Sequence, residues 1–362
     1  MDVTREQVLR YRVHVHQLDR VGEHDVLDAD VLDLGVQDTG TEGALWALAN
    51  RGVSTGGSRD WPDSLALAWT LRGAPHAYRR SDLAAVVSAT APLSEEDAGK
   101  RVFDAAKPLR AAGRAVEDAL RTVADEMLDI VVEPTVKGDV STALTARLDG
   151  SFLRFCRPCN TTHIFEQPFR LAALQAGLEL VPGTSPPVLR RIPGWTGPDA
   201  VPQRLDVIRA YLHLDGPATP KQVAAYLDAP VKEVRAHWPA DAVPVRVGKE
   251  QRWALADDLE TLASPPAAGG LTRLLSAFDP LLQIRDRELL VPDAARRKEL
   301  WVVLGRPGAV LQGHEIVGTW RPRASDSRLG LLVDRWAAVP EEPLAEQAER
   351  LASARGLEFA GF

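Results

Sequence analysis

The residue types most suited to chemistry lie near the middle of the chain, in Cys156-Arg157-Pro158-Cys159 with His163 four residues later. Thiolates and imidazoles bind zinc, and a Cys-x-x-Cys pair is also a redox motif. A zinc site needs four ligands, or three and an open position, and the chain has only two cysteines. A redox pair normally sits in a β-α-β setting, whereas this stretch is predicted to be a hairpin. We interpret it as a tight turn with small buried side chains and predict no metal and no cofactor, with zinc binding and redox chemistry as the alternatives.

A second group consists of basic residues around two predicted hairpin tips. Arginine presents a fork of donors that suits phosphates and guanine edges, and a basic hairpin loop can probe the minor groove of DNA. The residues that we predict to contact DNA are Arg72, His76, Arg79, Arg80, Arg154 and Arg157. The alternative for the first four is a solvated hairpin with local ion pairs, for example to Asp82.

Composition limits the classes of protein to consider. The chain has 362 residues, of which 45% are hydrophobic and 26% charged, which is typical of two or three globular domains. Two cysteines cannot form a disulfide scaffold, and no apolar run approaches the roughly 18–20 residues of a membrane span, so we predict a cytoplasmic protein. The net charge of −7 repels polyanions, so a DNA-binding chain of this kind must concentrate its cations on one face.

The clearest structural unit is predicted at residues 201–263. Thr219-Pro220-Lys221-Gln222 has the residues of a capping box at the start of a helix, with proline at the first helical position. A second short helix is predicted before Pro239, and two alternating stretches then flank Gly248-Lys249-Glu250 as a hairpin. This order of helices followed by a two-stranded wing predicts a winged helix-turn-helix.

The same order recurs twice more, less clearly, in residues 1–98 and 99–200. We predict short helices at 26–34 and 42–49, a hairpin around residues 72–75, a long helix over 116–127, a helix at 139–148, a hairpin around residue 159 and a proline-rich connector at 182–202. Residues 264–362 are predicted to form a β-rich, barrel-like module closed by a helix at 344–351. The fold class is therefore predicted as α+β, with three tandem winged helices and a small C-terminal β module.

Several motifs along this chain resemble the winged-helix DNA glycosylase superfamily of the AlkZ/YcaQ type. They are Leu34-Gly35-Val36-Gln37, Trp69-Thr70-Leu71-Arg72-Gly73-Ala74-Pro75-His76, Phe278-Asp279-Pro280-Leu281-Leu282 and Val317-Gly318-Thr319-Trp320. The resemblance covers essentially the whole chain. It implies tandem winged helices with a β-barrel module that form a channel for duplex DNA, a monomer, and excision of bulky or crosslinking alkylated purines.

The resemblance also implies a site at Gln37, Asp38 and Thr39. The family motif is Gln-x-Gln or Gln-x-Asp, so Gln37 matches its first position and Thr39 departs from its third, while a shift of one residue would place Asp38 at the acidic position. In this reading Gln37 holds the attacking water, Asp38 acts as general base or stabilises the sugar cation, and Thr39 orients water. The alternative is that the three residues cap a helix end.

Two functions, and a third alternative, follow from these patterns. The first is a DNA glycosylase without strand-cleavage activity, because none of the seven lysines stands out as a Schiff-base nucleophile. The second is a duplex-DNA-binding protein without catalysis, which sequesters damage or drugs or regulates genes, as the departure at Thr39 suggests. The third is a scaffold for protein contacts, in keeping with the acidic net charge.

Overall fold

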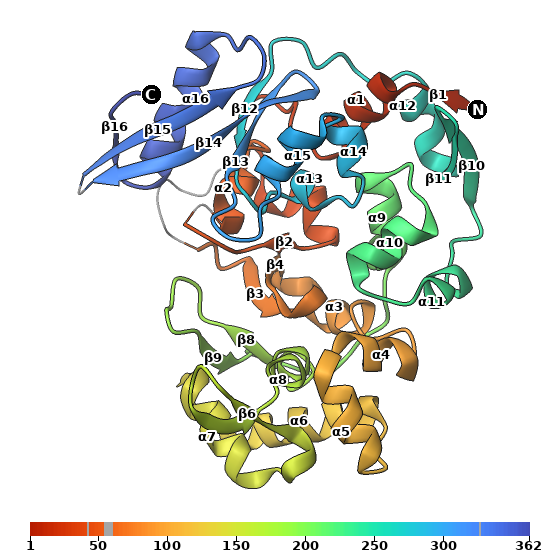
Figure 1. The fold of residues 1–362 in the computed structure, drawn as a ribbon, viewed down its shortest axis with the longest axis vertical. Helices are drawn as coiled ribbons and strands as arrows, with labels where there is room; N and C mark the ends of the chain where they lie inside the picture. Colours follow the sequence, from red (N-terminus) through yellow and green to blue (C-terminus); the bar gives the residue numbers. More distant parts are fainter. Residues whose placement is uncertain (42, 54–60, 326) are drawn as a thin grey trace. The chain divides into compact units, whose positions relative to one another are not determined.

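The structure is a computed structural model that describes residues 1–41, 43–53, 61–325 and 327–362. It has a mixed α+β fold, as the sequence predicts, and divides into two compact units (Figure 1). The first unit comprises Met1–Pro62, Arg209–Val223 and Pro239–Phe362, and the second comprises Asp63–Ile208 and Ala224–Trp238. The four predicted segments do not coincide with these units, and their boundaries stay a prediction.

The C-terminal part of the first unit is an open sheet covered by a helix. Its strands run in the order β12 (Thr272–Leu275), β13 (Gly308–Gln312), β14 (Glu315–Ser325), β15 (Arg328–Arg335), β16 (Glu358–Phe359). All neighbours are antiparallel except β15 and β16. Helix α16 (Glu341–Ala354) buries Leu344 and Leu351 in one core cluster with Trp320. The predicted β-rich module with its closing helix is therefore present, as an open sheet.

The N-terminal part of this unit begins with α1 (Arg5–Val15). Thr4 and Gln7 form a capping box at the start of this helix. The helix predicted at 26–34 is instead two 3₁₀ turns, η1 (Val26–Asp28) and η2 (Asp30–Asp33), separated by the extended backbone of Ala29. The Gln17 side chain explains the break, because it donates to the Asp28 carbonyl and accepts from the Asp30 N–H. Strand β2 (Val36–Gln37) and helix α2 (Gly43–Ala49) follow.

The predicted winged-helix segment has the expected order of elements. Its helices are α9 (Val207–Asp215), α10 (Pro220–Leu227) and α11 (Val231–Ala236), and its hairpin is β10 (Ala242–Val247) and β11 (Glu250–Leu255). Thr219 and Gln222 form the predicted capping box at the start of α10. Strand β1 (Asp2–Val3) extends the hairpin by pairing with β10 in parallel. Because α11 belongs to the second unit, a self-contained winged helix here stays a prediction.

The remaining elements of the first unit are short. They are η8 (Ala256–Asp258), α12 (Leu259–Ala263), α13 (Pro280–Gln283), α14 (Arg287–Leu290) and α15 (Ala294–Leu300). Residues of α1, β10, α13 and α14 share one core cluster that includes Tyr11, Val245, Leu282 and Leu290. The chain's N-terminal helix is thereby packed onto segments more than two hundred residues away.

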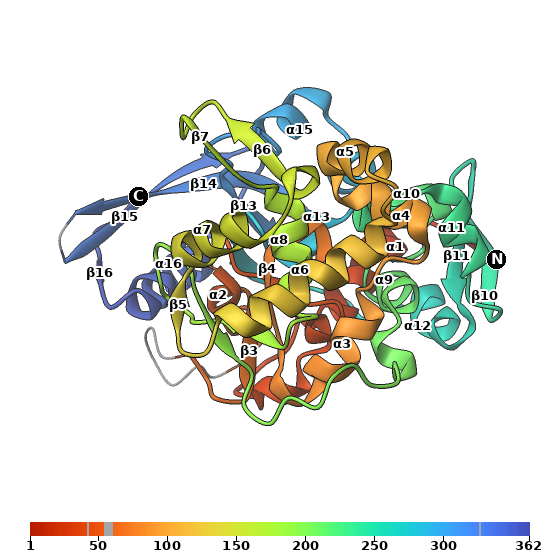
Figure 2. The ribbon, with the colours of Figure 1, turned by 90° about the horizontal axis from the view of Figure 1, so that it is seen from below.

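The second unit combines an antiparallel sheet with six helices that lie between residues 83 and 173, in addition to α11. Five of its strands lie in the order β4 (Pro75–Arg79), β3 (Leu65–Trp69), β8 (Leu178–Leu180), β9 (Val188–Arg191), β5 (Thr135–Val136), so the predicted connector at 182–202 contains a strand. The helices are α3 (Leu83–Ala89), α4 (Glu95–Arg101), α5 (Ala106–Ala111), α6 (Val116–Ile130), α7 (Lys137–Arg147) and α8 (Glu166–Ala173). Figure 2 shows α6 along its length, packed against α7 and α8.

Short 3₁₀ turns join these elements, namely η3 (Leu71–Gly73), η4 (Arg80–Asp82), η5 (Phe103–Ala105), η6 (Gly150–Phe152) and η7 (Gln203–Leu205). A separate hairpin, β6 (Leu153–Cys156) and β7 (Thr161–Ile164), carries the Cys-x-x-Cys stretch. Over the described residues of both units, no helix has the length and apolar character needed to cross a bilayer.

Candidate functional site

Gln37 ends β2, Asp38 and Thr39 follow it before α2, and all three side chains are partly exposed. The amide nitrogen Nε2 of Gln37 donates to Oγ1 of Thr39 at 3.0 Å. This bond fixes the plane of the amide and leaves its carbonyl oxygen, Oε1, as an acceptor for a water molecule. Thr39 therefore orients the Gln37 amide.

Asp38 caps helix α2. Its Oδ1 accepts from the backbone N–H of Ala44 at 2.8 Å, as the helix-cap interpretation expects. Burial nevertheless raises the pKa of Asp38 above the ordinary carboxyl range, against the effect of that bond. Gly43 makes room for the carboxylate, because a Cβ at this position would lie 2.1 Å from Oδ1, and its φ of +47° also favours glycine.

Helix α2 is fixed at its C-terminal end by buried polar contacts within the first unit. Trp46 Nε1 and Asn50 Nδ2 both donate to the Leu274 carbonyl on β12, at 2.6 and 3.0 Å. Arg51 binds Asp279 through two nitrogens at 2.9 and 3.0 Å, and both side chains are fully buried. Asp279 belongs to the Phe278–Leu282 motif, so this motif holds the helix that follows Gln37, Asp38 and Thr39.

The structure places His76 and Arg72 inside the second unit. His76 is 1% exposed, and burial, aided by the Arg72 charge, lowers its pKa to about 3, so it is neutral at physiological pH. Thr70 Oγ1 lies 3.1 Å from His76 Nδ1. Arg72 donates to the Tyr226 carbonyl and stacks over the Tyr226 ring, 4.7 Å from its centroid. The prediction that His76 faces DNA is wrong because its ring is a core group.

Arg79 and Arg80 are likewise engaged within their unit. Arg79 is 9% exposed and lies 3.6 Å from Asp82, which matches the alternative of local ion pairs. Arg80 reaches the buried Glu179 carboxylate at 2.9 Å and also donates to the carbonyls of Asp63 and Leu65. These guanidinium groups stabilise the sheet of the second unit, so nothing in their geometry favours the predicted contact with DNA.

The β6–β7 hairpin presents its arginines differently. Arg154 is partly exposed, with an ion pair to Asp104 at 3.1 Å and a cation–π contact with Phe165. Arg157 lies at the tip, is exposed, and has no ion-pair partner among the residues described. The predicted tight turn is present at residues 157–160, but Cys159 is exposed and Cys156 half-buried, so the prediction that the side chains are buried is wrong.

Sequence reasoning missed a basic cluster in the first unit. Burial and the nearby charges of Arg285 and Arg306 lower the pKa of Arg287 to about 10, so the Arg287 guanidinium stays charged at neutral pH. Arg285 and Arg287 line a cavity of about 890 Å³ together with Arg5, Arg246 and Arg252. The signal was available as Arg285-Asp286-Arg287, directly after the Phe278–Leu282 motif.

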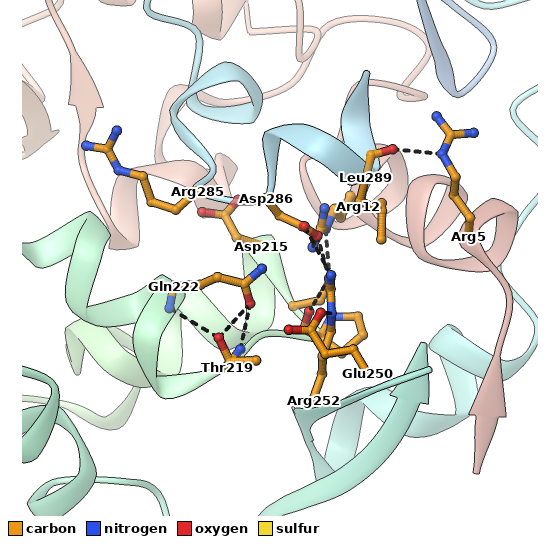
Figure 3. A network of polar contacts seen from close by, with 12 residues as sticks. Arg5, Arg12, Asp215, Thr219, Gln222, Glu250, Arg252, Arg285, Asp286 and Leu289 are labelled. Atoms are coloured by element: carbon orange, nitrogen blue, oxygen red, sulfur yellow. Dashed lines mark hydrogen bonds and ion pairs between the residues drawn. The ribbon is translucent and has the colours of Figure 1, made fainter. Parts of the chain in front are cut away.

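The same cavity wall also contains a buried acid, Asp286, which pairs with two arginines. Figure 3 shows Arg12 and Arg252 converging on Asp286, with Arg285 directed away from them. Arg12 reaches Asp286 at 2.9 Å, and Arg252 donates to both of its oxygens. Burial would raise the pKa of Asp286, but the two guanidinium groups outweigh it and hold that pKa below its usual range. Asp286 is thus neutralised from inside the unit, and Arg285 and Arg287 flank it in the chain.

Comparison with known proteins agrees with the resemblance seen in the sequence. The model of the family described as DNA glycosylase AlkZ-like matches residues 31–354, so the chain belongs to the AlkZ-like DNA glycosylase family. The solved structure of Streptomyces sahachiroi DNA glycosylase AlkZ has the same fold, with a TM-score of 0.72 and 20% sequence identity over 100% of both chains. No curated protein matches the chain.

Proposed function

We propose that the protein is a DNA glycosylase that hydrolyses the N-glycosidic bond of alkylated purines, bulky ones included, in duplex DNA. The observation that carries the proposal is a family match over residues 31–354 that includes a partly exposed Gln37–Asp38 pair. The solved DNA glycosylase AlkZ supports it through the shared fold.

The chemistry needs few groups because an N3- or N7-alkylated purine already carries a positive charge. Water attacks C1′ of the sugar, the bond from C1′ to the base nitrogen breaks, and its electron pair neutralises the departing base. Gln37 Oε1 accepts a hydrogen bond from the attacking water, and the Asp38 carboxylate takes up the water's proton. The same carboxylate stabilises the positive charge that develops on the sugar. The products are the free base and an abasic site.

Arginines of two regions provide the charge that holds a duplex. In the first unit these are Arg285, Arg287 and Arg306, whose mutual repulsion would be relieved by a phosphate. In the second unit Arg157 is exposed at a hairpin tip, which suits contact with a groove or a phosphate. Local clusters of this kind allow a chain of net charge −7 to bind DNA.

A duplex carrying N7-alkylguanine, heated after incubation to cleave abasic sites, tests the activity. The wild-type chain should release base above the spontaneous background, and Gln37→Ala should lose most of this release while it still binds duplex. Gln251→Ala, an exposed glutamine on β11, is the matched control and should remain active. No release from either small or bulky adducts would remove the enzymatic function.

A non-catalytic DNA-binding protein is the second candidate function. The observation that favours it is that Thr39 stands at the third motif position and cannot deprotonate water, while Asp38 already serves as a helix cap. This candidate predicts that Gln37→Ala leaves duplex binding unchanged and that no variant, nor the wild type, releases base. Absence of duplex binding at low salt would contradict both functions and favour a scaffold for protein contacts.

A further inference from the structure

The β6–β7 hairpin gathers the chain's two thiols and one imidazole at a single point. Cys156 pairs with Thr161 and Arg154 with His163, and one residue pair lies between these two, so Cys156 and His163 lie on the same face of the hairpin. Cys159 lies in the turn between the two strands, and the turn ends at Asn160, whose φ of +49° is in the left-handed region. The two Sγ atoms and a ring nitrogen of His163 all lie within 4.8 Å of one another.

Hydrogen bonds around this cluster orient its members as ligands. The backbone N–H of Cys159 donates to the Cys156 sulfur, and the His163 side chain is hydrogen-bonded to the same sulfur. His163 Nδ1 lies 2.7 Å from the Ile164 carbonyl, so it carries the proton and the lone pair falls on Nε2. A backbone carbonyl that fixes the tautomer of a ligating histidine is a recurring feature of zinc sites.

We propose that Cys156, Cys159 and His163 bind one Zn²⁺ ion, with water as the fourth ligand. Two thiolates and an imidazole are the donor set that zinc prefers, and three protein ligands with an open position satisfy its tetrahedral geometry. Two thiolates also neutralise the charge of the ion.

Zinc at this point would close the Arg157-Pro158 turn, because the ligands Cys156 and Cys159 flank it. The bound ion would therefore hold Arg157 in one position at the hairpin tip. This consequence rests on the proposed function, in which Arg157 contacts DNA, whereas metal binding itself does not depend on it.

The test uses the reduced, metal-free full-length chain, titrated with Co²⁺ as a spectroscopic probe and then with Zn²⁺ in competition with a chromophoric chelator. We expect one metal ion per chain and a thiolate-to-cobalt charge-transfer band, which only these two cysteines can produce. Zn²⁺ should abolish the band by displacement. Cys156→Ser combined with Cys159→Ser should remove it, and His163→Ala should weaken Zn²⁺ binding by roughly tenfold or more.

His237→Ala is the matched control, because His237 is an exposed histidine in the same unit and should leave metal binding unchanged. Circular dichroism of each variant confirms that it is folded. The proposal fails if the reduced chain binds no metal, or if binding persists without the two thiols. A Cys156–Cys159 disulfide that forms readily in a chain unable to bind metal would likewise contradict it and identify a redox pair. Because metal binding is measured without DNA, its failure is distinct from failure of the glycosylase function.

Discussion

At the residue scale, Asp38 caps helix α2 and, in the proposed mechanism, also accepts a proton, and these two roles make opposite demands on its carboxylate. As a helix cap it needs the hydrogen bond from Ala44, which favours the charged form, whereas partial burial favours the neutral form and raises its pKa. A carboxylate with a raised pKa is a better proton acceptor than an ordinary one. The cap also fixes the carboxylate beside Gln37, so one bond serves both stability and geometry.

This raised pKa predicts the pH dependence of base release. Asp38 accepts a proton only in its ionised form, so kcat/KM should rise with pH through a value above the ordinary carboxyl pKa and then level off. Asp38→Asn should lower the rate and abolish this rise. The measurement is the background-corrected rate of base release between pH 4 and pH 8. An unchanged pH profile in Asp38→Asn would exclude Asp38 as the base.

Gly43 predicts a stability effect at the same place. Gly43→Ala should destabilise the chain by about 1–3 kcal/mol, because the new Cβ would meet Asp38 Oδ1 and the backbone has a positive φ. Gly138→Ala on α7 is the matched control, since nothing lies within 4 Å of its Cβ position and its φ is not in the left-handed region, and it should be neutral or stabilising. Urea unfolding distinguishes the two. Equal effects of both substitutions would show that the contact at Asp38 carries no strain.

Much of the candidate site was predictable only through family resemblance. Gln37, Asp38 and Thr39 lie in a short strand and turn with no periodic pattern, so composition alone would not single them out. His76 shows the opposite error. Its position beside Arg72 in a predicted hairpin suggested an exposed tip, but Gln167 and Arg170 of α8 pack against Gly73 in that turn. Local spacing does not report which distant helix covers a hairpin.

At the element scale, the contacts that hold α2 in the first unit also fix the position of the residues that precede this helix. Its C-terminal end is tied to β12 by Trp46 and Asn50 and to the start of α13 by Arg51 and Asp279. Its N-terminal end receives the Asp38 cap. A shift of the helix would therefore displace the carboxylate that the proposed chemistry uses.

The buried ion pair makes this anchoring testable. Arg51→Leu should lower the free energy of unfolding by about 3–5 kcal/mol, because it leaves the fully buried Asp279 carboxylate without its partner. Arg121→Leu, which removes an exposed pair with Asp118, should cost roughly 1 kcal/mol or less. Chemical denaturation of both variants checks the difference. A small effect of Arg51→Leu would mean that α2 is held by its other contacts.

Elements with strong local signals were predicted well, and those that depend on distant contacts were not. The capping box at Thr219 and the hairpin at Gly248 are set by neighbouring residues and were correctly placed. The helix expected at 26–34 broke because Gln17 competes for its backbone groups. Strand β9 lies in a proline-rich stretch that reads as a loop, and only its pairing with β8 and β5 makes it a strand.

At the scale of the whole molecule, the acidic net charge requires that DNA binding depend on local arginine clusters. A net charge of −7 opposes a polyanion, so affinity must come from displaced counterions at a few sites. Arg285 and Arg287 line a cavity of the first unit, and Arg157 is exposed at the hairpin tip of the second. Binding should therefore weaken steeply as salt increases.

Replacing Arg287 tests this salt dependence quantitatively. Arg287→Gln should weaken duplex binding independently of sequence and reduce the slope of log affinity against log salt by about 1, the value for one phosphate contact. Arg121→Gln, an exposed arginine on α6, serves as control and should leave the slope unchanged. Fluorescence anisotropy across a salt series measures both. An unchanged slope for Arg287→Gln would show that Arg287 does not contact a phosphate of the duplex.

In the proposed mechanism, an amide held by Thr39 and a carboxylate held by α2 together activate water at the sugar of an alkylated nucleotide. The most direct test is single-turnover base release from an N7-alkylguanine duplex by the wild-type chain, Gln37→Ala and Asp38→Asn, with duplex binding measured in parallel. The wild type should release the alkylated base, and each variant should release it more slowly by about two orders of magnitude or more while it still binds the duplex. Release at the wild-type rate by both variants, or none by the wild type, would contradict this mechanism.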